Sequence, residues 1–213
     1  MIVTQDLCEV CAVSLDDVRS AVARLAHREQ IAIVSTSPTR LAHVLDDLVR
    51  IGRALGRDGE SIRTALQVRI DAIAARARPS NTRVVTLEWI EPLMIGGTWM
   101  PELVELAGGI PVGAIAGGPA PTISPAELRT LDPEVVIIKA CGFTVERTLA
   151  ERATIERDVI AHTNARVYVT DGNAYFNRPG PRLVESLEIT AACIDPESFG
   201  DFATKHAGAI VRL

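Results

Sequence analysis

Short apolar runs alternate with amphipathic stretches over the second half of the chain. Three of these runs are β-branched, as buried strands are, and they lie at 83–87, 134–139 and 166–170. Apolar residues then recur at helical spacing in the segments between and after them, for example at 181–193. Strands that alternate with helices are typical of parallel sheets with crossover helices. The pattern therefore predicts an α/β lobe over residues 81–213.

The first 80 residues have a different pattern. Apolar runs at 1–4 and 31–34 predict two strands, with one helix between them. From Pro38 to about Ala77 the apolar positions follow the i, i+3, i+4, i+7 spacing of amphipathic helices, with a break at 56–59. The predicted division is a remainder of an N-terminal lobe at 1–37, a helical segment with an inter-lobe helix at 38–80, and the C-terminal α/β lobe at 81–213.

Two strands and one helix are few for an α/β lobe, because a two-stranded sheet is marginally stable alone. The expected fold is therefore α/β, with two lobes of mostly parallel sheet and flanking helices. A long helix near 60–78 is expected to join the lobes, and the first lobe is expected to be incomplete. A start codon placed inside a longer gene would explain this. No positively charged segment followed by an apolar one marks an export signal at the N-terminus.

Composition excludes several classes of protein. Hydrophobic residues make up 47% of the 213 residues but aromatic residues only 4%, so the core must be aliphatic. The net charge is −5 and no basic run occurs, which argues against nucleic acid as a partner. No apolar stretch approaches the ~20 residues needed to span a bilayer, so no membrane span is expected.

The few aromatic residues are concentrated after the predicted strands. Five of the eight lie in loops that follow strand-like runs, namely Trp89, Trp99, Phe143, Tyr175 and Phe176. Ligands of open α/β sheets bind outside the carboxyl ends of the strands. This placement indicates a site for a large, flat or apolar ligand. The alternative is that these rings merely cap the sheet.

Thiols and one carboxylate are further candidates for ligand contact. Cys8 and Cys11 form a C-x-x-C motif after the first strand, and Cys141 lies in another strand-end loop. Such thiols could carry redox chemistry, contact a soft metal or ligand, or be structural. Glu88 could bond donors of a ligand, whereas Cys193 is expected to be a buried small hydrophobe. No phosphate loop, nucleophile elbow or other catalytic constellation occurs, so no enzyme is expected.

Four blocks of the chain resemble a known family. IVTQDLCEVCAV at 2–13, LEWIEPLMIGGTWMPELVELAGG at 87–109, DPEVVIIKACGF at 132–143 and VYVTDGNAYFNRPGP at 167–181 are similar to the cobalamin-binding branch of the cobalamin and iron-siderophore substrate-binding proteins of ABC importers. The resemblance implies two α/β lobes, a rigid inter-lobe helix and a ligand held in the cleft between the lobes. It also implies transfer of the ligand to a membrane permease without chemical conversion. The branch often has Pro and His where this chain has Ala140 and Thr98.

Carried over residue by residue, the resemblance implies a ligand site and a ligand. The cleft would be lined by Cys8, Cys11, Glu88, Trp89, Trp99, Cys141, Phe143, Tyr175, Phe176 and Arg178. The ligand would be a corrinoid or another metal chelate, with no resident cofactor or metal, and the location would be the periplasm or cell surface. Two rival interpretations remain open: a cytoplasmic sensor or scavenger of the same fold, and a thiol oxidoreductase that uses the C-x-x-C pair.

Overall fold

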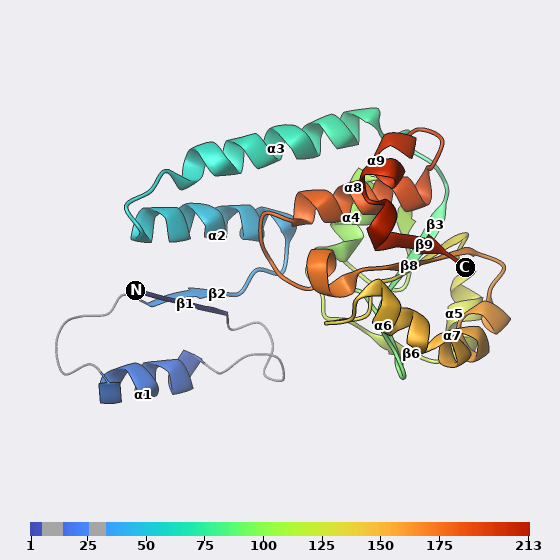
Figure 1. Ribbon diagram of the computed structural model, residues 1–213, viewed down its shortest axis with the longest axis horizontal. Coiled ribbons are helices and arrows are strands. Elements are labelled where there is room, and N and C mark those ends of the chain that lie inside the picture. The colour runs from blue at the N-terminus through green and yellow to red at the C-terminus, as the bar shows by residue number, and fades with distance from the viewer. Residues whose placement is uncertain (6–14, 26–32) are drawn as a thin grey trace.

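Two separate sheets organise the chain (Figure 1). The computed structural model describes residues 1–5, 15–25 and 33–213. In the first sheet β1 (Ile2–Gln5) pairs in parallel with β2 (Ile33–Thr36). The second sheet contains seven strands, and within the described residues no strand pairs across the two sheets. The predicted two-lobed α/β fold is therefore confirmed.

The first lobe consists of β1, β2 and the helix α1 (Leu15–Leu25). In Figure 1 the two strands lie between α1 and the helix α2. The strand predicted at 1–4 is confirmed. The strand predicted at 31–34 is described from Ile33 to Thr36, and residues 31 and 32 lie outside the described part of the chain.

The helix α2 (Leu41–Ala54) begins later than the sequence predicts. Pro38 is favourable in the first turn of a helix, but a contact from the other lobe sets the start. The backbone N–H of Leu41 donates to Glu102 Oε2 at 2.8 Å, and Arg40 Nε donates to Glu102 Oε1 at 2.9 Å. A carboxylate that accepts from the first turn stabilises a helix N-terminus. The start predicted at residue 38 was therefore wrong because the capping group is distant in the sequence.

The helix α3 (Gly59–Arg76) connects α2 to the second lobe. Its first part packs on α2, and its later turns pack on α8 (Leu183–Ile194), as Figure 1 shows. The Arg69 guanidinium on α3 donates to two carboxylates of α8, Glu185 at 3.2 Å and Glu188 at 3.0 Å. The long helix thus joins α2 to the second lobe, and its predicted role as an inter-lobe helix stays a prediction.

The second sheet has a parallel centre and antiparallel margins. Its strands follow the order β6-β4-β3-β7-β8-β9, and β5 pairs with β3. The bounds are β3 Arg83–Ile90, β4 Leu93–Ile95, β5 Ile110–Pro111, β6 Thr122–Ile123, β7 Val135–Ile138, β8 Arg166–Thr170 and β9 Ile210–Arg212. The three predicted strands are confirmed as β3, β7 and β8, which are parallel to one another. The antiparallel strands β4, β6 and β9 were not predicted, because each has only two or three residues.

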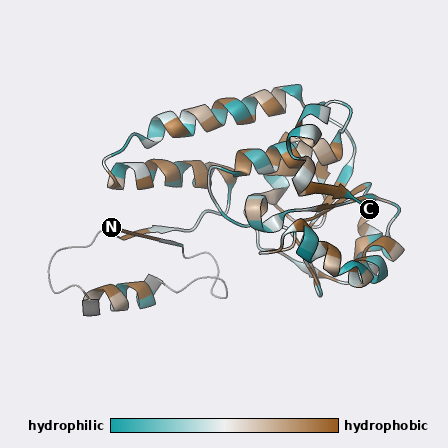
Figure 2. Cartoon of the chain, viewed as in Figure 1, coloured by the Kyte–Doolittle hydropathy of each residue, from teal (hydrophilic) through white to brown (hydrophobic). Residues whose placement is uncertain are grey.

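Helices cover both faces of this sheet. The remaining helices are α4 Met100–Leu106, α5 Pro125–Leu131, α6 Val145–Ala150, α7 Arg152–Asp158 and α9 Gly200–Lys205, with short 3-10 helices at Ile160–His162 and Ala207–Ala209 and a π-helical turn η2 at Gly172–Phe176. Alternate residues of β7 point to opposite faces: Val135 and Ile137 pack towards α3, α4 and α8, whereas Val136 and Ile138 pack towards α5 and α7. Figure 2 shows the apolar colour on the strand nearest the C-terminus, β9. The core is mainly aliphatic, as the composition predicts, with Trp99, Tyr168, Phe176 and Phe199 also buried in it.

Two local features of the second lobe follow from its sequence, and one of them, the burial of Cys193, confirms a prediction made above. The hydroxyl of Ser124 accepts from the Glu127 N–H at 3.2 Å, and the Glu127 carboxylate accepts from the Ser124 N–H at 2.7 Å, which completes a capping box at the start of α5. Cys193 is fully buried in α8, and burial raises the pKa of its thiol. No helix in the described ranges is long and apolar enough to cross a membrane.

Candidate ligand-binding cleft

A cleft of about 440 Å³ opens where the end of β1 faces the carboxyl ends of β3 and β7. Gln5 and Thr39 line it from the N-terminal side of the chain. The second lobe contributes polar side chains at the strand ends and rings from the loops that follow them. An adjoining hollow of about 510 Å³ shares Gln5, Cys141, Asn177 and Pro179 with this cleft. The carboxyl edge of the parallel strands is the edge at which α/β sheets bind ligands.

An ion pair between a buried lysine and a partly exposed glutamate forms part of the cleft wall. Lys139 directly follows β7, and its side chain is only 3% exposed. Its Nζ donates to Glu88 Oε2 at 3.3 Å, and Glu88 extends from β3 with 30% of its side chain exposed. Burial lowers the pKa of Lys139, although the nearby Glu88 and Cys141 oppose that shift. A Cβ at Gly96 would lie 2.9 Å from Lys139 Cε, so glycine leaves the space that the lysine occupies.

Trp99 lines the same cleft from the residue before α4. It is 5% exposed, and its indole N–H has no hydrogen-bond partner within the described residues. Buried donors without an acceptor are rare and need an explanation. An acceptor atom on a bound ligand would satisfy this one.

The loop that carries Trp99 is fixed by its backbone. The N–H of Thr98 donates to the Gly118 carbonyl at 2.7 Å, and the Gly117 N–H donates to the Thr98 carbonyl at 2.9 Å. Thr98 has φ of 51°, and Gly117 has φ of 81°. A β-branched residue in this left-handed region is strained by roughly 1–3 kcal/mol. Such strain persists because the two loops hold each other, and it is typical of functional sites.

The turn η2 brings a third loop to the cleft. A Cβ at Gly172 would lie 2.2 Å from the Ala140 carbonyl oxygen, so only glycine permits this approach to the end of β7. The side-chain amide of Asn177 also donates to the Ala140 oxygen, at 3.3 Å. Phe176 is 1% exposed and lines the cleft, whereas the exposed Arg178 lines the adjoining hollow.

The predicted site residues fall into separate groups. Glu88, Trp99, Cys141 and Phe176 line the cleft, and Cys141 also lines the adjoining hollow with Arg178. Tyr175 packs edge-on against His206, with ring centroids 5.6 Å apart. Trp89 and Phe143 pack against each other at 5.2 Å and do not line the cleft. Cys8 and Cys11 lie outside the described residues, so their predicted role stays a prediction, as do the ligand contacts of the other eight.

The clearest omission from the sequence-based site is Lys139. The sequence indicates only that Lys139 is the polar residue at the end of a strand, because it directly follows four apolar residues. A charged residue at the carboxyl end of a buried parallel strand was the available signal. Its pairing with Glu88 could not be inferred, since 51 residues separate the two.

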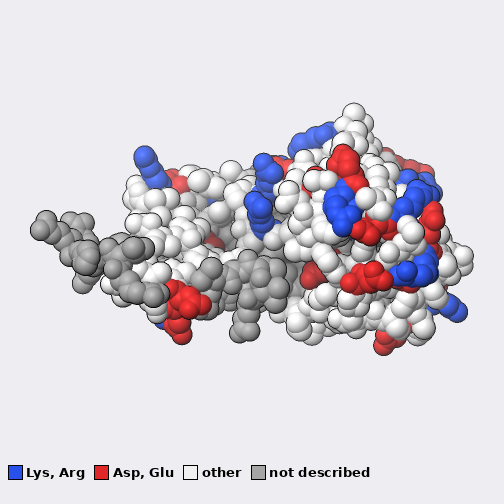
Figure 3. All heavy atoms as spheres, turned by 60° about the horizontal axis from the view of Figure 1, so that its bottom comes forward, with Lys and Arg blue, Asp and Glu red and all other residues white. Residues whose placement is uncertain are grey.

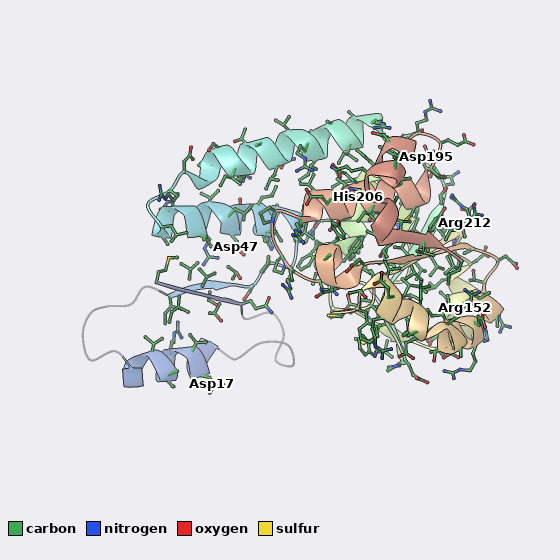
Figure 4. All side chains as sticks on the ribbon, in the orientation of Figure 1. Asp17, Asp47, Arg152, Asp195, His206 and Arg212 are labelled. Carbon is green, nitrogen blue, oxygen red and sulfur yellow. The ribbon has the colours of Figure 1, made fainter. Side chains whose placement is uncertain are left out.

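A second ion cluster, centred on the buried Glu188, lies away from the cleft. The Glu188 carboxylate accepts from Lys205 Nζ and His206 Nε2, each at 2.7 Å, and from Arg69 at 3.0 Å. Burial alone would raise the pKa of Glu188, but the three hydrogen bonds together lower it. Figure 4 shows His206 among the C-terminal elements, far from Asp47 on α2. Since three of its four members come from α3, α8 and the end of α9, the cluster ties these helices together.

The described residues offer no group of three or more His, Cys, Asp or Glu side chains able to hold a metal ion. Charges on the visible face of the second lobe are mixed in sign (Figure 3). Many of them form exposed pairs, such as Arg152 with Glu156 at 2.7 Å. No single-sign patch on that face suggests a polyanionic partner.

Comparisons with known proteins identify the fold. No family model matches the chain, and no curated protein matches it. Among solved structures, a periplasmic heme-binding protein from Pseudomonas aeruginosa has 19% identity and a TM-score of 0.70, covering 92% of this chain and 72% of its own. An ABC transporter substrate-binding protein from Listeria monocytogenes has 16% identity and a TM-score of 0.73, with coverages of 92% and 77%. A periplasmic vitamin B12-binding protein from Vibrio cholerae has 14% identity and a TM-score of 0.61, with coverages of 92% and 74%. This chain has the two-lobed fold of periplasmic substrate-binding proteins.

Proposed function

We propose that this chain binds a corrinoid or a similar metal chelate between its lobes and delivers it to an ABC-type permease. The observation that carries the proposal is the cleft at the carboxyl ends of β3 and β7, which has Gln5 and Thr39 on one side and Trp99 and Phe176 on the other. Solved structures with the same fold include binding proteins for heme and for vitamin B12, and one protein with bound Ni(II). The first two are binding proteins by name, which supports a binding role for this chain.

The size and chemistry of the cleft suit a large chelate. The cleft of about 440 Å³ and its neighbour of about 510 Å³ share lining residues, and ligand pockets commonly have volumes of about 300–1,000 Å³. A buried aromatic contact contributes on the order of 1–3 kcal/mol through its apolar area. Micromolar affinity needs about 8 kcal/mol. Trp99 and Phe176 are only 5% and 1% exposed before a ligand arrives, so burying them further adds little. Polar contacts at Lys139 and Arg178, and rings such as Trp89 and Phe143 that rearrange towards the ligand, would therefore supply most of the affinity.

We further propose that capture uses the division of the chain into residues 1–37, 38–80 and 81–213. The second lobe would present the ligand platform, and the first would cover it. Contacts from the predicted second-lobe residues that lie outside the cleft lining would require their side chains to rearrange around the ligand. These residues include Trp89 and Phe143, which now pack together.

The direct test is titration of the purified chain with hydroxocobalamin, followed by its visible spectrum and by calorimetry. We expect saturable binding at one site with a Kd near or below the micromolar range. Absence of heat and of spectral change with every corrinoid and ferric chelate tested would refute the ligand class and leave the fold unaffected.

A substitution at Trp99 locates the site. Trp99→Phe keeps most of the packing but removes the indole N–H, and we expect it to weaken corrinoid binding about fivefold, or ~1 kcal/mol. Trp89→Ala, which the sequence predicts to weaken binding tenfold or more, is the comparison variant. Weakening by Trp89→Ala alone would place the ligand on the Trp89–Phe143 side instead.

A further inference from the structure

The ion pair in the cleft wall has a property that bears on ligand choice. Lys139 and Glu88 carry opposite charges, so together they present a neutral pair with a donor and an acceptor side by side. The Nζ to Oε2 distance of 3.3 Å is long for a charged hydrogen bond. An ammonium has three N–H donors and a carboxylate has about four acceptor positions. Both groups therefore retain capacity for a ligand.

Burial makes this pair selective. The Lys139 side chain is 3% exposed, and Glu88 is 30% exposed on the same wall. Charges interact more strongly where water is excluded. A ligand carboxylate placed beside Lys139 would also meet the like charge of Glu88, and a ligand cation beside Glu88 would meet Lys139. In either case two like charges would lie close together where little water screens them, which disfavours binding.

A primary carboxamide matches both partners. Its carbonyl oxygen can accept from Lys139 while its NH₂ group donates to Glu88, and no net charge is added to the wall. Trp99 lines the same cleft and carries a buried indole N–H without a partner among the described residues, which is a further donor for a carbonyl oxygen that reaches it. The donors Lys139 and Trp99 and the acceptor Glu88 therefore match an amide, which both accepts and donates hydrogen bonds. They match a carboxylate less well, because a carboxylate only accepts.

We infer that Lys139 and Glu88 form a subsite for a primary carboxamide, and that the chain selects chelates with amide edges over chelates with carboxylate edges. This inference rests on the proposed function and specifies its ligand. The Lys139–Glu88 subsite would favour corrinoids with peripheral amides over corrinoids with carboxylates in the same positions. It would also disfavour haem, whose edge carries two carboxylates. A site built to pair polar groups rejects ligands that leave those groups unpaired.

The test compares two corrinoids that differ at the edge alone. Dicyanocobinamide carries peripheral amides, and dicyanocobyrinic acid carries carboxylates in their place. Visible-spectrum titrations of the full chain should give a Kd at least about tenfold lower for the amide form, which corresponds to ~1.4 kcal/mol. Haem serves as a second carboxylate ligand and should follow the acid.

Substitutions assign the selectivity to the pair. Glu88→Gln removes the negative charge and leaves Lys139 to favour anions, so the preference for the amide form should fall below about threefold through tighter binding of the acid. Lys139→Met keeps the buried shape and should weaken the amide form about tenfold. Glu91→Gln is the matched control, because Glu91 is an exposed carboxylate paired with Arg157 outside the cleft lining. It should leave both Kd values unchanged.

The outcomes separate this inference from the function on which it rests. Equal affinity for the two corrinoids, or an amide preference that Glu88→Gln leaves intact, would overturn the carboxamide subsite while corrinoid binding stands. Failure of the unsubstituted chain to bind either corrinoid would overturn this inference, and failure to bind haem and other ferric chelates as well would overturn the proposed function. If circular dichroism shows that Lys139→Met is unfolded, the Glu88→Gln result decides the question alone.

Discussion

The two sheets differ most in how completely their strands are buried. All four residues of β7 are fully buried, with helices on both faces. In the first sheet Thr36 is the one buried residue among the eight of β1 and β2, and Val3 is 46% exposed. Parallel strands are ordinarily covered on both faces. The comparison indicates that the second lobe is the stable platform and that the first lobe depends on α2 and on contacts with that platform.

Amide hydrogen exchange should reveal the largest difference between the lobes. Local opening costs little free energy where few apolar contacts are lost. We expect amides of β1 and β2 to exchange at least about a thousandfold faster than those of β7 and β8, which corresponds to ~4 kcal/mol. Alternatively, the edge of the first sheet pairs with a second copy, as exposed edges do. Equal protection of both sheets in a strict monomer would contradict this comparison.

A matched pair of valine substitutions tests the difference in burial between the two sheets. Val136→Ala removes buried methyl groups from β7 and should lower the free energy of unfolding by about 2 kcal/mol. Val3→Ala makes the same change at a half-exposed position of β1 and should cost less than about 0.5 kcal/mol. Urea denaturation followed by fluorescence measures both. Similar costs would mean that Val3 is covered in solution.

The contact between Glu102 and the start of α2 is the next largest effect. Glu102→Ala removes a helix cap and an ion pair that join the two parts of the chain. We expect a loss of about 1 kcal/mol, with faster exchange at Leu41. Glu105→Ala lies on the same helix but is exposed, and it serves as the control. An unchanged start of α2 in the Glu102 variant would show that Pro38 and its neighbours set it after all.

The smallest effect concerns acid. The pKa of Glu188 is lowered in the folded chain from its ordinary value of 4.5, so the native state binds fewer protons there than the unfolded state. Its contribution to stability is present above about pH 4.5 and is lost as the pH falls through the lowered value. Glu188→Gln should flatten the stability–pH curve below pH 4.5 and lower stability at pH 7. A curve parallel to that of the unsubstituted chain would assign the acid loss to other carboxylates.

The sequence predicts the parts of this structure that local pattern determines. The run Val135–Ile138 is read correctly as a buried strand because four consecutive apolar residues have few alternatives. The start of α2 is missed because its cap, Glu102, is 61 residues away. The cleft is found in part for the same reason: strand ends locate Glu88 and Trp99, but only the tertiary structure brings Lys139 beside Glu88. Trp89 and Phe143 follow strands as well, yet they pair with each other.

The reciprocal backbone bonds between Thr98 and Gly117–Gly118 have a kinetic consequence. A loop that is already held in its strained conformation loses no further conformational entropy when a ligand arrives. The loop that carries Trp99 therefore needs no rearrangement before it contacts a ligand. The observed rate constant for this contact should increase linearly with ligand concentration. A slow phase in stopped-flow binding whose rate does not depend on ligand concentration would then be assigned to rearrangement of the first lobe, and not to ordering of the loop that carries Trp99.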